Sequence, residues 1–410
     1  MPEKDILVGL DIGTTKIAVV VAEKGQFNEI KILGVGVSPS EGLRRGVVIN
    51  IDKTVRSIQK AVEDAELMSG VEIKSVYAGV AGDHIRSFNS RGIVAVSNNE
   101  ISQADIERGI EAAKAISLPI DREILHILPQ EYIIDDQDGI RDPIGMSGVR
   151  LEVETHIVTG AVTSAQNIYK SVERAGLIVQ DLVLEPLASS YAVIGDDERE
   201  LGVGLLDIGG GTTDIALFFG GSIRHTAVIG LGGKNVTNDI AIGLRTPPDQ
   251  AEKIKIDYGC CDINQITAEE YITVPGVGGR EPRKVSRSIL TRIIQPRMEE
   301  IYHLALREIK KSGYLELLTS GIILTGGCSM IAGSVELAES VFDLPVRLGN
   351  PEGISGLTDS ANNPKFATGV GLLIYGDHNR SNSEYYETAD DDELFDKITV
   401  TMKKWFREFF

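Results

Sequence analysis

The chain has 410 residues and is too long for one compact core. Its composition, 42% hydrophobic and 25% charged, is that of an ordinary globular protein. The formal net charge of −19 argues against a protein that coats nucleic acid, because most of its surface would repel phosphate. The three cysteines lack metal-ligand spacing and are predicted to be reduced thiols, the first residues do not form a secretory signal, and no apolar run reaches the ~18 residues needed to span a bilayer. We therefore expect two or more domains, either soluble or bound to a membrane only at its surface.

The first half of the chain predicts alternating strands and helices. Residues 6–13, 16–39 and 75–82 contain short apolar runs typical of strands, and residues 52–70 show helical periodicity that stops at Gly70. Residues 84–162 differ in pattern from the segments on either side, with a strand, a helix that begins after Ser102 and two further strands. They are therefore predicted to form a small inserted domain. A helix, a strand and a short helix then follow over residues 164–176, 177–186 and 187–195.

The same pattern then restarts. The stretch "LGVGLLDIGGGTTDIALFFGG" resembles "ILVGLDIGTTKIAVVVAEKG", which lies about 195 residues earlier. Each stretch reads as two strands joined by a glycine-containing turn. The chain is therefore predicted to contain two related halves, each opening with the same β-hairpin.

The two hairpin turns are candidate phosphate-binding sites. Phosphate oxygens need several backbone N–H donors at close range, and glycine keeps side chains out of the way. The expected donors are Gly13, Thr14 and Thr15 in the first turn, with Lys16 adding a positive charge, and Gly209, Gly210, Gly211, Thr212 and Thr213 in the second. Asp11 and Asp207 end the preceding strands, where carboxylates can hold the waters around Mg²⁺. A single such turn could be an ordinary hairpin, but two matched turns favour a nucleotide clamped between the halves.

Three other segments fit such a clamp. The strand before "TGGCSM" ends in glycines that could let a base or sugar approach the backbone at Gly326, Gly327 and Ser329. Gly232 and Gly233 stand at a predicted helix start, a favourable position for an anion or ribose. Glu185 precedes Pro186 and could orient a water molecule or bind Mg²⁺, although it could also be a solvated loop acid. A dinucleotide-binding fold fits less well, because its glycines open a helix rather than joining two strands.

These motifs together resemble a known family. "GLDIGTTK", "LEPLASSY", "LDIGGGTTDIALF", "GLGGKNVTNDIA", "AEKIKIDYG" and "ILTGGCSMIAG" are similar to the phosphate, connecting and adenosine motifs of the actin/Hsp70/sugar-kinase superfamily. The similarity is greater to the FtsA family of bacterial cell-division proteins and extends over nearly the whole chain. It implies an α/β fold of actin-like, duplicated, two-lobed type, with an inserted 1C-type subdomain and a C-terminal amphipathic helix.

The resemblance also implies subdomain boundaries. They are 1–83 and 163–197 for subdomain 1A, 84–162 for 1C, 198–227 and 306–375 for 2A, and 228–305 for 2B. Residues 376–393 are polar and acidic and are predicted to be a flexible linker.

Ligands and partners follow from the same resemblance. ATP and Mg²⁺ are the implied cofactors, with the phosphate and metal residues named above and with Gly232, Gly233, Glu252, Lys255, Gly326, Gly327 and Ser329 on the nucleoside. Asp207 and Glu185 are the candidates for positioning water in a slow hydrolysis. The implied partners are the tail of the tubulin-like protein FtsZ, a second copy of the chain in a filament, other division proteins and anionic membrane lipids, but no nucleic acid. A basic segment that contains Arg287, Arg292 and Arg297 falls in the predicted 2B and could dock the FtsZ tail, or could be a solvated helix face.

The last 17 residues predict a membrane anchor. On a helix at about 100° per residue, the apolar side chains share one face and the basic ones the other. The apolar residues are Leu394, Phe395, Ile398, Met402, Trp405, Phe406, Phe409 and Phe410, and the basic ones are Lys397, Lys403, Lys404 and Arg407. This pattern is typical of an interfacial helix on anionic lipid, although a core helix can share it.

The expected function is that of an ATP-binding, actin-like protein that polymerises and fastens the division ring to the cytoplasmic face of the cell membrane at the division site. Two alternatives remain open at the level of sequence. A small-molecule kinase of the same superfamily would need an acceptor-binding insertion and a catalytic aspartate, neither of which can be assigned. An Hsp70-like chaperone would need a long substrate domain after about residue 376, where only a linker and a short helix remain.

Overall fold

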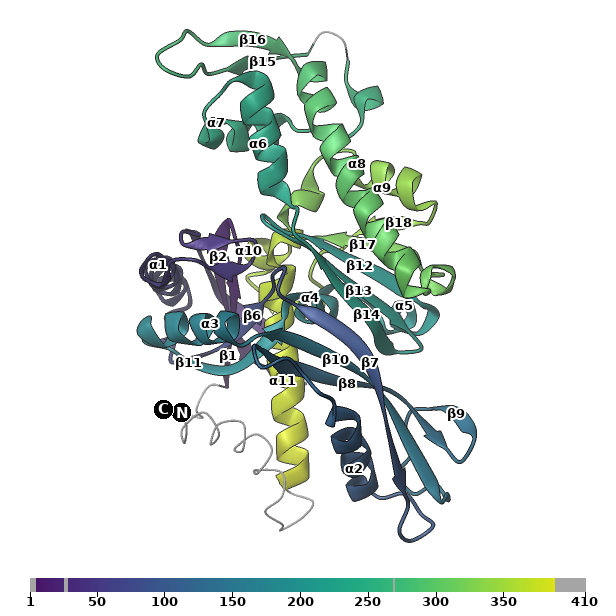
Figure 1. Cartoon of the computed structure of the whole chain (residues 1–410). Coiled ribbons are helices and arrows are strands. Elements are labelled where there is room, and N and C mark those ends of the chain that lie inside the picture. Colours follow the sequence, from purple (N-terminus) through teal and green to yellow (C-terminus); the bar gives the residue numbers. More distant parts are fainter. Residues whose placement is uncertain (1–4, 26–28, 268–269, 388–410) are drawn as a thin grey trace.

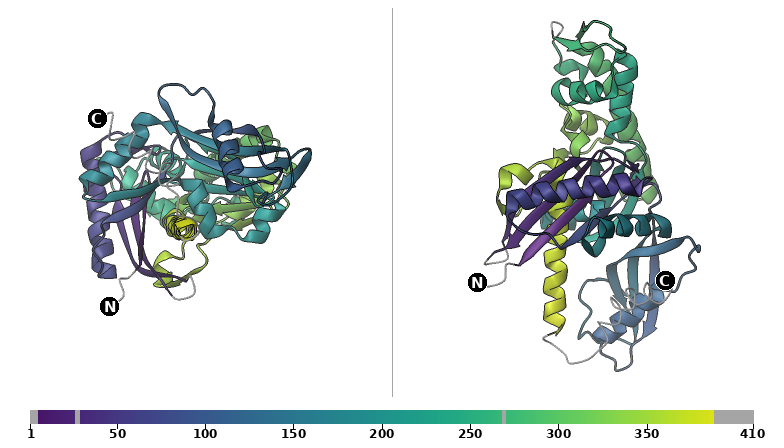
Figure 2. Two further views of the ribbon diagram at one scale, coloured as in Figure 1. Left: turned by 90° about the horizontal axis from the view of Figure 1, so that it is seen from below. Right: turned by 90° about the vertical axis from the view of Figure 1, so that its left-hand side faces the viewer.

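The computed structural model describes residues 5–25, 29–267 and 270–387. Two α/β lobes lie side by side, one built on a six-stranded sheet and the other on a five-stranded sheet (Figure 1). A mainly helical subdomain extends from one end of the molecule and a domain with a four-stranded sheet from the other. The two further views in Figure 2 show that helix α11 (Ala367–Glu387) projects from the body on the same side as the four-stranded domain.

The sheet of the first lobe has the strand order β11-β6-β1-β2-β3-β19. Strands β1, β2 and β3 form an antiparallel meander, and β6 and β11 continue the sheet in parallel from β1. The strands are β1 (Ile6–Ile12), β2 (Lys16–Lys24), β3 (Ile30–Pro39), β6 (Ser75–Val80), β11 (Ile178–Leu184) and β19 (Ile354–Gly356). Their apolar runs are nearly continuous because helices cover both faces of the sheet.

Four helices flank the sheet of the first lobe, and the longest, α1, has clear local start and stop signals. The helices are α1 (Ile51–Ser69), α3 (Val162–Arg174), α4 (Glu185–Val193) and α10 (Thr358–Ala361). The Asn50 side chain caps α1 by accepting from the Lys53 amide, and Gly70 ends it in the left-handed conformation, as the sequence predicted. A small hairpin of β4 (Leu43–Arg44) and β5 (Val47–Val48) stands between β3 and α1.

The sheet of the second lobe repeats the first. Its order is β14-β13-β12-β17-β18, with β12, β13 and β14 antiparallel and β17 and β18 added in parallel. The strands are β12 (Val203–Ile208), β13 (Thr213–Phe219), β14 (Ser222–Ile229), β17 (Ile322–Thr325) and β18 (Val346–Leu348), flanked by α5 (Asp196–Leu201) and α9 (Ser334–Phe342). The predicted duplicated, two-lobed α/β fold is therefore confirmed.

The inserted domain packs on the edge of the second sheet. It contains β7 (Arg86–Ala95), α2 (Gln103–Lys114), β8 (Arg122–Ile134), β9 (Gln137–Ile140) and β10 (Arg150–Ala161). Its polar side chains contact β14: the Ser87 hydroxyl donates to the Thr226 carbonyl at 2.9 Å, and the Gln130 amide to the Ile223 carbonyl at 2.7 Å. The prediction of an inserted domain here agrees with this separate sheet, which has one strand, β9, that the sequence did not suggest.

The helical subdomain contains α6 (Gly233–Leu244), α7 (Pro248–Tyr258), the hairpin of β15 (Tyr271–Val274) and β16 (Arg283–Ser286), and the start of α8 (Arg287–Ser312). Helix α8 packs against α6 and β16 at one end and against β13 and β14 at the other. The expected boundary at residue 305 therefore lies inside one continuous helix that joins the helical subdomain to the second lobe.

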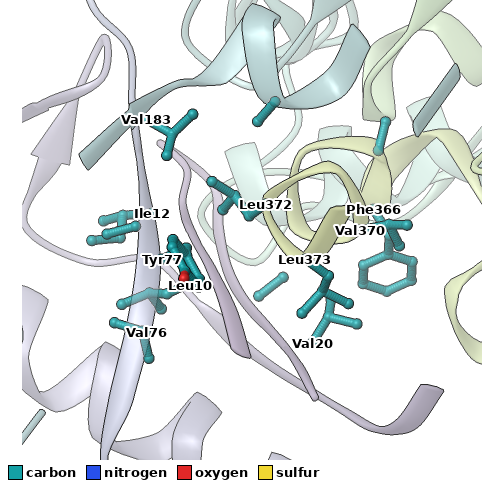
Figure 3. Close-up of a cluster of buried hydrophobic side chains, with 14 of the residues drawn as sticks. Leu10, Ile12, Val20, Val76, Tyr77, Val183, Phe366, Val370, Leu372 and Leu373 are labelled. Carbon is teal, nitrogen blue, oxygen red and sulfur yellow. The ribbon is translucent and has the colours of Figure 1, made fainter. Parts of the chain in front are cut away.

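Helix α11 fills the core between the sheet of the first lobe and α4. Figure 3 shows Val370, Leu372 and Leu373 of this helix among Leu10, Val20 and Tyr77 of the sheet, and all six side chains are at most 6% exposed. The sequence predicts a flexible linker from residue 376, and this is wrong for residues 376–387, which continue α11. The buried first half supplies the helix nucleus, and each further residue then adds at little cost.

Two contacts hold the helix to the sheet near this point. The Tyr375 hydroxyl donates to Asp181 at 2.7 Å, and Lys24 and Asp377 form an ion pair at 2.6 Å.

Residues 388–410, which include the predicted membrane helix, lie outside the described residues. Within the described part of the chain, no helix is long and apolar enough to cross a bilayer.

Candidate functional site

The turns of the two matched hairpins touch each other between the lobes. A Cβ atom added at Gly210 would lie 2.4 Å from the Oγ1 and Cγ2 atoms of Thr15, and one added at Gly211 would lie 2.4 Å from the Thr14 hydroxyl oxygen. Only residues without a side chain allow this approach, which the sequence alone could not have measured. The structure thus brings together the two predicted phosphate-binding turns.

Backbone donors remain available where the turns meet. The Gly209 amide is already used, because it donates to the Thr212 carbonyl at 3.0 Å within the turn. The amides of Gly210 and Gly211, in contrast, donate to no acceptor in the described part of the chain. Consecutive free N–H groups of this kind form the anion-binding concavity that a phosphate requires.

The start of helix α6 holds the second turn in place. The Gly233 amide donates to the Gly209 carbonyl at 2.9 Å, and the Lys234 amide to the Gly210 carbonyl at 2.8 Å. Gly232 is the N-cap of α6, and a Cβ atom there would lie 2.7 Å from the Gly209 carbonyl oxygen. These contacts give the glycines a structural role, since α6 can approach the turn only through backbone atoms, and their binding of an anion or ribose stays a prediction.

The two predicted metal-site aspartates lie near this junction. Lys16 pairs with Asp11 at 2.6 Å. Asp207 accepts hydrogen bonds from the Ser189 hydroxyl at 2.7 Å and the Thr368 hydroxyl at 3.3 Å. Burial raises the pKa of Asp207 to about 6; the Ser189 hydrogen bond opposes the shift and the charge of Asp11 adds to it.

Two further carboxyl groups surround Asp207. Asp214 lies directly opposite it in the β12–β13 ladder and accepts from the Thr212 hydroxyl at 2.8 Å. Burial, and then the charge of Asp207, raises the pKa of Asp214 to about 8, and its Oδ1 atom is shielded from solvent without a partner in the described residues. Burial also raises the pKa of Glu185 well above its usual range, with the charges of Asp11, Asp214 and Asp207 adding to the shift.

This group of carboxyl groups favours an added cation. Like charges in a poorly solvated place disfavour ionisation, and of the described cations only Lys16 forms an ion pair with one of these carboxylates. No group of three or more His, Cys, Asp or Glu side chains among the described residues is arranged to ligate a metal directly. An ion bound mainly through water, which Mg²⁺ prefers, fits this donor set better than a fully coordinated one.

Three of the predicted nucleoside residues, Gly233, Glu252 and Lys255, form a second cluster around the start of α6. Lys255 is buried and contacts the Glu252 carboxylate at 2.8 Å, the Thr237 hydroxyl at 3.0 Å and the Gly233 carbonyl at 3.2 Å. Thr237 also donates to Glu252. Glu252 and Lys255 thus pair with each other and support the α6 N-terminus, and the nucleoside contact that the resemblance implied for them stays a prediction.

The glycine pair after β17 lies beside the carboxyl groups. Gly326 has a left-handed φ of 84°, and a Cβ atom there would lie 2.4 Å from Asp207 Oδ1. At Gly327 the nearest atom to an added Cβ would be Lys365 Cβ at 3.7 Å, so the space above it is open. The hydroxyl of Ser329 donates to the Gly326 carbonyl at 2.6 Å, and so it shapes the turn.

The three predicted docking arginines do not form one surface. Positions 287, 292 and 297 lie five residues apart on α8 and therefore point in different directions. Arg287 pairs with Glu270 at 2.5 Å, and Arg297 pairs with Asp239 at 2.6 Å and with Glu300. Arg292 is exposed and has no ion-pair partner among the described residues, so it alone keeps a free charge.

Sequence reasoning missed several residues of the site. Asp214 follows the second turn and could have been found from the hairpin spacing, because it must face Asp207 across the ladder. Ser189 stands in the motif "LEPLASSY" but was assigned no role, and Thr368 on α11 gave no signal. Both contact Asp207 only because α4 and α11 pack together beside β12.

Comparisons with known proteins show the family and support the fold. The family model described as cell division protein FtsA matches residues 204–371, and that of the SHS2 domain inserted in FtsA matches residues 82–159, close to the predicted 84–162. The chain is 50% identical over 404 residues to the cell division protein FtsA of Pseudomonas aeruginosa, covering 98% of this chain and 97% of that protein. It is 42% identical over 412 residues to FtsA of Escherichia coli K12, covering 99% and 96%.

Solved structures of low sequence identity share the fold. The chain of a PilM–PilN type IV pilus biogenesis complex has a TM-score of 0.67 at 18% identity and covers 90% of this chain and 98% of its own length. MreB 5 of Spiroplasma citri bound to AMPPNP has a TM-score of 0.57 at 16% identity, covering 94% and 99%. These likenesses support the actin-like fold, and the curated relatives identify the group: the chain belongs to the FtsA family of cell division proteins.

Proposed function

We propose that the chain binds ATP between its two hairpin turns, assembles with further copies into an actin-like filament, and links FtsZ to the cytoplasmic membrane at the division site. The contact between the two turns is the observation that carries this proposal, because it places unused amides from a glycine-rich loop between two lobes of one duplicated fold. A fold neighbour, MreB 5 of Spiroplasma citri, is described as bound to AMPPNP and, in a second structure, to ADP.

The residues present fit a nucleotide with its magnesium ion. The amides of Gly210 and Gly211 would bind phosphate oxygens, together with those of Gly13, Thr14 and Thr15 in the first turn. The bound Mg²⁺ would supply positive charge near Asp11 and Asp207. That charge would favour the ionised carboxylates and free Lys16 to contact phosphate.

Glu185 and Asp207 are proposed to orient a water molecule for slow hydrolysis. Their raised pKa values mean that both carboxyl groups hold protons more strongly than usual in the ligand-free chain. Added positive charge lowers such values, so these groups become hydrogen-bond acceptors mainly when the site is loaded. The role of ATP is proposed to be chiefly structural, through closing the two lobes into the shape that polymerises.

The helical subdomain is proposed to bind the FtsZ tail. Large apolar side chains are exposed there on three elements, with Ile242 at 76%, Ile256 at 71% and Tyr271 at 65%. Arg292 adds an unpaired positive charge in the same subdomain. Exposed apolar groups and a free cation in one subdomain suit an extended peptide that carries both apolar and acidic residues.

The segment 394–410 is proposed to bind the membrane surface. Each large apolar side chain contributes roughly 1.5–3 kcal/mol when fully buried, and each basic residue about 1 kcal/mol near anionic lipid. Ordering the chain costs part of this, so one copy should bind reversibly and a filament of many copies firmly.

Co-sedimentation with vesicles tests the proposal. The full chain should pellet with vesicles that contain anionic lipid when Mg·ATP is present, and much less with vesicles of zwitterionic lipid alone. A variant that lacks residues 394–410 should stay in the supernatant while it binds ATP with unchanged affinity. Equal pelleting of the two chains would refute the anchor, and failure of both to bind ATP would refute the nucleotide site.

A further inference from the structure

Arg45 occupies a strained position at the tip of the small hairpin between β3 and α1. Its φ angle is 50°, in the left-handed region, and Gly46 follows with a φ of 75°. Two successive left-handed residues form the turn type in which Asn or Gly is usual at the first position. The chain therefore holds an arginine where the backbone alone would favour another residue, and such strain commonly accompanies a functional side chain.

The hairpin tip is fixed against the first phosphate turn. The Gly46 amide donates to the Thr14 hydroxyl at 3.0 Å. A Cβ atom at Gly46 would lie 2.7 Å from the Ala81 carbonyl oxygen, so the tip rests directly on backbone at the end of β6. Arg45 therefore directly precedes Gly46, whose amide contacts Thr14 in the middle of the first phosphate turn.

The Arg45 side chain crosses to the other lobe. A Cβ atom added at Gly230 would lie 3.5 Å from Arg45 Cδ and 3.8 Å from its Nε and Nη1 atoms. Gly230 directly follows β14 and leads into the N-terminus of α6, whose amides hold the second phosphate turn. The guanidinium group is therefore placed between the structures that carry the two turns.

The exposed Arg45 side chain has no ion-pair partner among the described residues. No carboxylate in the described residues lies within 4.0 Å of its guanidinium nitrogens, although the chain carries a net charge of −19. The other cations near the turns are engaged: Lys16 pairs with Asp11, and Lys234 donates to the Thr14 carbonyl at 3.4 Å. Arg45 is thus the cation at this junction that is available to an anion.

A second polar group beneath the turn also lacks a partner. Both ring nitrogens of His84 are shielded from solvent without a hydrogen bond to any described residue. A Cβ atom at Gly82 would lie 2.8 Å from His84 Nδ1 and 3.2 Å from the Arg45 carbonyl oxygen, so the imidazole is close to the backbone of the turn.

We propose that Arg45 binds the terminal phosphate of the nucleotide held between the two hairpin turns, and thereby makes the chain distinguish ATP from ADP. This inference rests on the proposed nucleotide site. A guanidinium group is planar and presents paired N–H donors, which suit two oxygens of one phosphate group. The side chain contacts Gly230 without any ligand present, so loss of the terminal phosphate would remove only the guanidinium–phosphate contact and leave the rest of the nucleotide bound.

Nucleotide titrations of the full chain test this assignment. Mg·ATP, Mg·ADP and AMP are titrated calorimetrically into the wild type, Arg45→Asn and Arg44→Gln. Asparagine tolerates the left-handed conformation, so Arg45→Asn should fold, and its thermal midpoint checks this. Arg44→Gln removes the same charge one residue away. We expect Arg45→Asn to weaken ATP binding about tenfold or more with ADP and AMP affinities changed less than about twofold, and Arg44→Gln to leave all three unchanged.

The other outcomes separate the two proposals. If the wild type binds no nucleotide, the proposed function fails and the inference with it. If the wild type binds ATP and Arg45→Asn keeps its ratio of ATP to ADP affinity, the inference alone is overturned. An equal loss for ATP and ADP would also overturn it, because it would show a role toward the diphosphate or in lobe closure.

Discussion

Replacing Gly210 with alanine should separate the two hairpin turns and abolish tight ATP binding. The new Cβ atom would lie 2.4 Å from Thr15 Oγ1 and Cγ2, and 2.9 Å from Thr15 Cβ. Rotating the threonine moves the first two atoms but not its Cβ, so a rotamer change cannot relieve the overlap. Ordinary carbon contacts are about 3.5–4.0 Å, and one turn must therefore shift by roughly 1 Å.

A shift of one turn by roughly 1 Å would be enough to weaken ATP binding strongly. Hydrogen bonds from the turn amides to phosphate lose most of their strength when the donor–acceptor distance grows from about 2.9 Å to about 3.6 Å or more. If two charge-assisted bonds are lost at about 1.5 kcal/mol each, the affinity falls by about 3 kcal/mol, or on the order of 100-fold. The matched control is Gly209→Ala in the same turn, whose Cβ would meet nothing closer than the Thr212 carbonyl oxygen at 3.5 Å.

The assay is a calorimetric titration of Mg·ATP into the full chain, with a thermal scan to confirm that each variant is folded. We expect Gly210→Ala to lose about 100-fold in affinity and Gly209→Ala to stay within about threefold of the wild type. Wild-type affinity in a folded Gly210→Ala chain would refute the idea that the touching turns grip one triphosphate. Equal losses in both variants would show that the turn is sensitive to any added side chain, and not to the contact with Thr15.

Two further predictions concern the carboxyl groups and the docking surface. Because the folded-state pKa of Asp214 is raised from 3.8 to about 8, the folded chain retains this proton while the unfolded chain loses it, so stability should fall as the pH rises across that window. Asp214→Asn should remove this pH dependence, which amounts to up to about 1.36 kcal/mol of unfolding free energy per pH unit. The thermal midpoint of the ligand-free variant should therefore rise relative to that of the wild type between about pH 5 and 8. A constant difference between the two midpoints across this range would contradict the prediction. Arg292→Glu should weaken binding of an FtsZ tail peptide several-fold in an anisotropy titration, whereas Arg307→Glu on the far half of α8 should not, and equal affinities for all three chains would move the docking site elsewhere.

Local sequence signals determined much of this protein. The duplicated hairpins, the strand-ending aspartates and the helix start at Gly232 could be read directly, because strand periodicity and glycine turns depend on residues close in sequence. The repeat predicted two related halves, and the order of the strands in their sheets came from the structure. Family resemblance added Glu252 and Lys255 as expected nucleoside residues, and their ion pair became visible only in the structure.

Tertiary structure decided the remainder. Whether residues 376–387 are linker or helix depended on α11 being nucleated in the core of the first lobe, which polar composition concealed. The sequence suggests a free charge on Arg297, but the packing of α8 on α6 pairs this residue with Asp239. The environment of Asp207 and the crossing of Arg45 to Gly230 both join segments more than 150 residues apart. No local pattern encodes such contacts, because they arise only when the two lobes and α11 pack together.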